Sequence, residues 1–156
     1  MPITIHLPRG LHHGVLADLR RPHEHAAERI GFLYGRFVSG DQPLVMMTRY
    51  VPVPDEQYVV DDTIGARING DAIRAAMQGV LDTGEGVFHT HLHEWPGTPW
   101  FSRTDDEELP RLIPAFRAVG PTQAAGLFLL SPDSAIADVW LPGAQGPERV
   151  IRISVV

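Results

Sequence analysis

Helical and strand-like patterns alternate along this 156-residue chain, and that alternation restricts its fold more than any other feature. Residues 3–7 alternate between apolar and polar positions, as a short strand does. Residues 30–40 and 43–54 are β-rich, and the turn-forming sequence Ser-Gly-Asp-Gln-Pro lies where they meet. This combination predicts a hairpin near the N-terminal end of the fold.

Helical and strand-like segments continue to interleave through the rest of the chain. Apolar residues recur at helical spacing in residues 10–29 and 69–81, and the second segment begins with the N-cap residue Asn69. Residues 102–119 begin with cap-competent Ser and Thr and an acidic first turn, as a helix does, but contain two prolines. Strand-like runs occupy 86–91, 124–131, 134–143 and 148–156. With no internal repeat and no linker, the pattern predicts a single α/β (α+β) domain over residues 1–156.

The composition narrows the classes of function. The chain has no cysteine, which excludes disulfides, thiolate metal sites and a cysteine nucleophile. Its net charge is −6 and its longest basic cluster is Arg20-Arg21, so we expect no nucleic-acid partner. We find neither a secretory signal pattern in the first residues nor a run of 18 apolar residues. We therefore expect a soluble cytoplasmic protein without a membrane partner.

Two histidines on the strand-like run 86–91 are candidate metal ligands. His89 and His91 are two residues apart, so their side chains project from the same face of a strand. Asp105 follows at the start of an acidic segment that suits a helix N-terminus. Two imidazoles and one carboxylate leave the fourth position of a tetrahedral ion open to water. That arrangement is typical of catalytic zinc.

These residues, together with an upstream glutamate, resemble the JAMM metalloproteases of the MPN fold. That family has a glutamate, then far downstream His-x-His, a spacer and Ser-x-x-Asp. Here Ser102-x-x-Asp105 follows the histidines, and residues 28–35 read Glu-x-x-Gly-x-Leu-x-Gly, like the family's helix-to-strand segment. The spacer after His91 has ten residues where the family usually has seven. We interpret the difference as a local elaboration of a Pro/Gly-rich loop.

The resemblance implies a fold, a mechanism and a substrate class. The fold would be a curved, mostly antiparallel sheet flanked by helices. One zinc ion per chain would be held by His89, His91 and Asp105, Glu28 would be the general base, and Ser102 would stabilise the oxyanion. The substrate would be a ubiquitin-like protein or its conjugate, cleaved after the C-terminal tail.

Other interpretations of the histidines remain open at this level. Histidine-triad nucleotide hydrolases alternate three histidines with apolar residues, and cupins pair His-x-His with a glutamate, but neither family uses Glu28 or Ser102. An MPN domain without metal could instead be a scaffold. We interpret His93 as a solvated or substrate-side residue. The remaining histidines and aromatics of note are interpreted as surface histidines (His12, His13, His23, His25), an apolar substrate wall or simple loop packing (Trp95, Trp100, Phe101) and core (Trp140).

Overall fold

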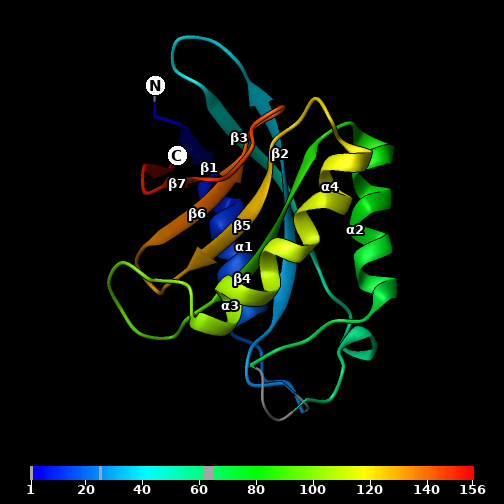
Figure 1. Ribbon diagram of the computed structural model, residues 1–156. Coiled ribbons are helices and arrows are strands. Elements are labelled where there is room, and N and C mark those ends of the chain that lie inside the picture. Colours follow the sequence, from blue (N-terminus) through cyan, green and yellow to red (C-terminus); the bar gives the residue numbers. More distant parts are fainter. Residues whose placement is uncertain (1, 25, 62–64) are drawn as a thin grey trace.

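The computed structural model describes residues 2–24, 26–61 and 65–156, and within them the strands form one eight-stranded sheet (Figure 1). The elements, in chain order, are β1 Thr4–Leu7, α1 Arg9–Leu19, β2 Ile30–Val38, β3 Leu44–Pro52, η1 Asp55–Gln57, α2 Gly70–Thr83, β4 Gly86–Leu92, α3 Arg103–Glu108, η2 Leu109–Leu112, α4 Ile113–Val119, β5 Ala125–Leu130, β6 Ala135–Trp140, β7 Glu148–Val150 and β8 Ile153–Val155. The predicted mixture of helices and strands is confirmed. No helix in the described part of the chain has the length and apolar character that a membrane span requires.

The two edges of the sheet lie close together. In the strand order β7-β6-β5-β4-β2-β3-β1-β8, the two edge strands are consecutive in the chain. The path from Val150 to Ile153 covers three residues and so spans at most about 11 Å. The Ile3 N–H also donates to the Glu148 carboxylate at 2.9 Å, which links the β1 side to β7. The sheet therefore curls until its edges nearly meet.

The central strand of this sheet is β4, which pairs with β2 on one side and β5 on the other. The predicted hairpin is present, because β2 pairs antiparallel with β3. β2 also pairs antiparallel with β4, whereas β4 and β5 are parallel and are joined through α3, η2 and α4. All seven positions of β4 are buried. A strand so placed brings its alternate side chains into two separate layers.

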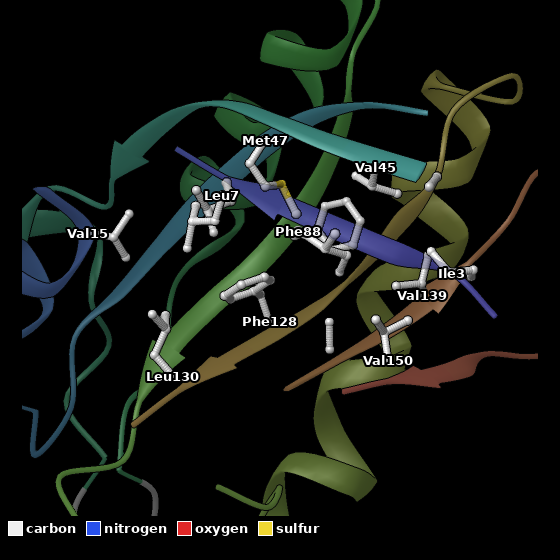
Figure 2. Close-up of a cluster of buried hydrophobic side chains, with 14 of the residues drawn as sticks. Ile3, Leu7, Val15, Val45, Met47, Phe88, Phe128, Leu130, Val139 and Val150 are labelled. Carbon is white, nitrogen blue, oxygen red and sulfur yellow. The ribbon is translucent and has the colours of Figure 1, made fainter. Parts of the chain in front are cut away.

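Each face of the sheet has its own hydrophobic core. One face packs against α1, and its core includes Leu7, Met47, Phe88 and Phe128 (Figure 2). The other face packs against α2 and α4, through residues such as Phe116. Figure 1 shows α1 behind the sheet and α3 and α4 in front of it. On β4 the apolar side chains of Phe88 and Leu92 belong to the α1 face, and the histidines point toward the other helices.

Two predicted elements differ from the observed ones, and both ends of α2 are set by particular residues. The helix predicted over residues 10–29 ends at Leu19, because proline at position 22 disfavours helical backbone just before it. The strand-like run 148–156 is broken by residues 151 and 152, where the chain passes from one sheet edge to the other. The predicted cap Asn69 accepts a hydrogen bond from the Ala72 N–H, and Gly84 ends α2 with a φ of 72°.

Candidate metal centre

Strand β4 and the residue after it place three histidines in one line. His89, His91 and His93 are 2%, 2% and 4% exposed, and the His93 N–H continues the strand pairing by donating to the Leu130 carbonyl at 2.9 Å. Neighbouring imidazole centroids lie 5.6 Å apart between His89 and His91, and 5.1 Å apart between His91 and His93. The interpretation of His93 as a solvated residue is wrong, because the strand pairing extends to it and buries its side chain.

Asp105 faces the second and third of these histidines. Its Oδ2 lies 3.1 Å from His91 Nε2 and 3.5 Å from His93 Nε2. The carboxylate is held by a capping box at the start of α3, in which the Ser102 N–H donates to Asp105 Oδ2 at 2.9 Å and the Asp105 N–H donates to Ser102 Oγ at 3.0 Å. Ser102 thus fixes the direction in which Asp105 points.

Glu28 reaches the same place from the loop before β2. Its Oε1 lies 3.7 Å from His93 Nε2, and its side chain is 31% exposed. The Glu28 N–H donates to the Gly65 carbonyl at 2.9 Å. A Cβ at Gly65 would lie 2.8 Å from Glu28 Cδ, so glycine leaves the space that this carboxyl group occupies.

The neighbouring Arg29 anchors the loop that carries Glu28. Its guanidinium is 4% exposed and donates to the carbonyls of Arg21 and Pro22 at 2.8 and 2.6 Å. It also donates to Asp55 Oδ1 at 2.6 Å, and this hydrogen bond lowers the pKa of Asp55. A single buried cation therefore joins the end of the loop to η1.

The donor atoms suit a divalent metal ion. One ligand atom each of Glu28, His91 and His93 lie within 4.8 Å of one another, and Asp105 contacts both histidines. Zinc bonds of about 2.0–2.1 Å in a tetrahedron give ligand separations of about 3.4 Å, close to the 3.1 and 3.5 Å between Asp105 and the two imidazoles. Among the described residues, neither Nδ1 atom of His91 or His93 has a hydrogen-bond partner. Both rings approach the Asp105 carboxylate through Nε2.

Contacts within the site shift the pKa values of Asp105 and His93. Burial opposes ionisation of Asp105, but its hydrogen bonds with His91 and His93 and from the Ser102 N–H outweigh burial and hold the pKa of the carboxyl below its ordinary value. The contact with Asp105 raises the pKa of His93 despite partial burial, and the Glu28 carboxylate adds to that rise. Asp105 is therefore an ionised carboxylate at neutral pH.

His89 lies one strand step away from this group. It lines a pocket of about 290 Å³, together with Asp105 and Thr104 from α3. The rest of the lining is mostly aliphatic, from Ile30, Ala66, Ile68, Ile73, Leu109 and Leu112, with Arg67, Glu108 and Arg111. Burial, and secondarily His91, lower the pKa of His89 to about 3.

The predicted site and the observed grouping differ by one histidine. The structure places Glu28, His91 and Asp105 around His93, and His89 is not in this group. Spacing could have indicated this choice. Eight residues separate His93 from Ser102, which is nearer to the seven of the JAMM pattern than the ten that follow His91.

The remaining histidines and aromatics fall into separate groups. The His12 and His13 rings are 6.2 Å apart, and His25 is outside the described residues. The interpretation of His23 as a surface histidine is wrong, because its side chain is 3% exposed and its ring packs 4.3 Å from the Tyr58 ring. Trp95 and Trp100 are 44% and 62% exposed and 5.6 Å apart, with Trp95 4.7 Å from the His93 ring. By contrast, Phe101 and Trp140 are buried, and for Trp140 the core prediction is confirmed.

No protein-family model and no curated protein matches this chain. Among solved structures, the chain is similar to the STIL N-terminal domain of Trichoplax adhaerens, with 9% sequence identity and a TM-score of 0.43. The match covers 88% of this chain and 40% of that one, so the chain spans less than half of the length of this neighbour.

Proposed function

We propose that this protein is a zinc-dependent peptidase of the JAMM type. His91, His93 and Asp105 would hold the metal, and Glu28 would be the general base. The observation that carries the proposal is the convergence of these side chains from three separate segments: the end of β4, the first turn of α3 and the loop before β2. Two imidazoles, an ionised carboxylate and a second carboxylate beside them are the groups that metal-assisted hydrolysis requires.

Each residue then has a distinct task. A bound zinc ion would supply an acidified water and polarise the scissile carbonyl. Glu28 takes the proton from that water and passes it to the leaving amine, and its partial exposure leaves room for both exchanges. Ser102 is exposed, and its Oγ accepts the Asp105 N–H, so the hydroxyl proton stays free to donate to the developing oxyanion.

The substrate class and the MPN assignment rest on the motif. Glu28, the histidines and Ser102-x-x-Asp105 resemble the family that cleaves after the C-terminal tail of ubiquitin-like proteins. The mixed sheet with helices on both faces is compatible with that family's fold. We therefore propose an MPN-type domain that hydrolyses a peptide or isopeptide bond of a ubiquitin-like protein. The complete donor set favours this enzyme over a metal-free scaffold.

Metal content and hydrolysis, measured on the same preparations, test the proposal. The substrates are a linear fusion and a lysine-linked conjugate of a ubiquitin-like protein, incubated with and without a chelator. We expect zinc-dependent cleavage by the unmodified protein. Glu28→Gln should retain zinc and lose about 100-fold or more in rate, which is the low end for a general base, whereas His93→Ala should lose the metal. The exposed His13→Ala is the matched control.

Three results would count against parts of the proposal. A well-folded protein that takes up no zinc from a zinc-replete buffer would favour the scaffold. Metal that is lost in His89→Leu but retained in His93→Ala would favour His89 as the second imidazole ligand. Zinc-loaded protein that leaves both substrates intact would reject the substrate class.

A further inference from the structure

The loop between β4 and α3 places aromatic rings against two histidines of the candidate metal centre. The Trp95 ring lies 4.7 Å from the His93 ring and is tilted from it by 33°, and the Phe101 ring lies 6.2 Å from the His91 ring. The Trp100 ring lies 5.6 Å from the Trp95 ring. Trp95 and Trp100 are 44% and 62% exposed, whereas His93 is 4% exposed. The loop thus leaves apolar surface in water while one of its indoles packs on a buried imidazole.

The two imidazoles lack the hydrogen bond that usually orients a metal-bound histidine, which runs from the second ring nitrogen to a carboxylate, a carbonyl or water. Among the described residues, neither Nδ1 of His91 nor that of His93 forms one. The Trp100 backbone lies near enough to His93 to raise its pKa, but without the geometry of a hydrogen bond. Contacts at Nε2 alone leave a ring free to tilt about that atom, so ring packing must set its orientation. In the described part of the chain, the rings against His93 are those of His91, at 5.1 Å, and Trp95, at 4.7 Å.

The loop that carries Trp95 is held in place at its middle. The Gly97 N–H donates to Asp133 Oδ1 at 2.8 Å. The Ser131 hydroxyl is buried and lies 2.6 Å from the Gly97 carbonyl, the nearest of its acceptors among the described residues. Gly97 has a φ of 92°, which favours glycine, and prolines at positions 96 and 99 restrict the backbone on either side. These contacts tie the loop to the turn between β5 and β6 and fix the place of its indole.

We infer that Trp95 is a positioning residue for His93. Its indole packs on the imidazole and limits the tilt of the ring, so that Nε2 stays directed at the carboxylates of the site. Ser131 and Asp133 act one step further out, because they hold the loop that carries the indole. As an aid to metal binding, the assignment rests on the proposed zinc centre. The restraint on the His93 ring follows from the packing and does not depend on a metal.

The order of the histidine rings tests the restraint in the metal-free protein. Relaxation of ¹³C in the rings reports their motion on the ps–ns timescale. We expect Trp95→Ala to lower the order parameter of the His93 ring and to leave that of the His89 ring unchanged. Trp95→Phe should restore the order, because it puts a ring back against the imidazole. Trp100→Ala is the matched control, since it removes a more exposed indole from the same loop, and it should leave the His93 ring ordered.

Zinc affinity shows whether the restraint serves the metal. The Kd for Zn²⁺ is measured by competition with a chromophoric chelator. Trp95→Ala should weaken zinc binding about 10-fold, which is the low end for the loss of an outer-shell partner of a metal-bound histidine. Trp95→Phe and Trp100→Ala should stay close to the unmodified protein. Asp133→Ala, which removes an exposed side chain and releases the Gly97 N–H, should weaken zinc binding by less than Trp95→Ala.

The two measurements separate the ways in which the inference can fail. An unchanged His93 order parameter in Trp95→Ala, an equal loss of order in Trp100→Ala, or no restoration in Trp95→Phe would overturn it. Lost ring order with an unchanged Kd for zinc would overturn the link to the metal. If the unmodified protein takes up no zinc and the His93 ring still responds as expected, the zinc centre is rejected and the positioning of His93 by Trp95 stands.

Discussion

The two faces of strand β4 differ in what they bury. Toward α1, Phe88 and Leu92 join a core of aliphatic and aromatic side chains with almost no exposed surface (Figure 2). Toward α2, α3 and α4, the same strand buries His89 and His91, and its continuation buries His93. One strand thus supplies a closed apolar layer on one side and a row of imidazoles on the other.

This difference separates stability from chemistry. Apolar burial stabilises the fold by roughly 25 cal/mol per Å² removed from water, whereas buried imidazoles cost free energy unless a partner satisfies them. The α1 face therefore holds the sheet in shape, and the opposite face can keep polar groups at fixed distances. We expect substitutions on the α1 face to lower stability without changing metal binding. Substitutions of the metal-binding histidines should instead weaken metal binding.

The largest effect should come from the α1 face. Phe128 is fully buried in that core, and Phe128→Ala should lower the free energy of unfolding by about 3 to 5 kcal/mol, because it removes apolar contacts and leaves a cavity. Urea unfolding of both proteins measures the difference. Zinc bound per folded molecule should not change. A variant that loses zinc while still folded would show that the two faces are not independent.

The next effect comes from the metal side. Zinc that binds only the folded state should raise the free energy of unfolding by about 2.7 kcal/mol when free zinc is about 100 times its Kd. Thermal unfolding with and without zinc measures the increment for the unmodified protein, Phe128→Ala and His93→Ala. We expect the first two to respond equally and the third to show no response. An equal response in His93→Ala would remove His93 from the ligand set.

The contrast between the faces also explains what the sequence could and could not predict. The strand, its alternation, the cap at Asn69 and the candidates His91 and Asp105 follow from local patterns, and the candidate Glu28 follows from the resemblance to the JAMM motif. The spacing to Ser102 favours His93 over His89, but the choice itself depends on how far strand pairing with β5 continues and on where the capping box turns Asp105. Neither is a local property of the residues involved.

The pocket and the anchoring of Glu28 were missed for a related reason. Arg29 has no special motif, yet it holds the loop before β2 through two carbonyls earlier in the same loop and a carboxylate 26 residues further along the chain. The pocket forms between segments that are far apart in the chain. Only long-range packing brings these groups together, and a single sequence gives no sign of it.

A smaller effect should distinguish His89 from the ligands beside it. His89→Leu replaces a buried imidazole whose Nδ1 has no partner among the described residues, so the free energy of unfolding should rise by about 1 kcal/mol. Zinc stabilisation should remain as in the unmodified protein. Urea unfolding with and without zinc checks both statements. A destabilised His89→Leu would mean that the imidazole already has a favourable contact in the folded protein.

The smallest effect concerns the ion pair that anchors the Glu28 loop, and it should depend on pH. The hydrogen bond from Arg29 lowers the pKa of Asp55 below its ordinary value of 3.8. A carboxyl with a lowered folded pKa contributes stability that is present above the ordinary value and is lost as the pH falls through the folded pKa. The difference in unfolding free energy between the unmodified protein and Asp55→Asn should therefore be larger at neutral pH than in acid below that range. The same comparison with Phe128→Ala should show no such dependence, because that substitution removes no titrating group. If the Asp55→Asn difference is the same at both pH values, the ion pair does not stabilise the loop, and the two carbonyl contacts of Arg29 alone hold Glu28 in place.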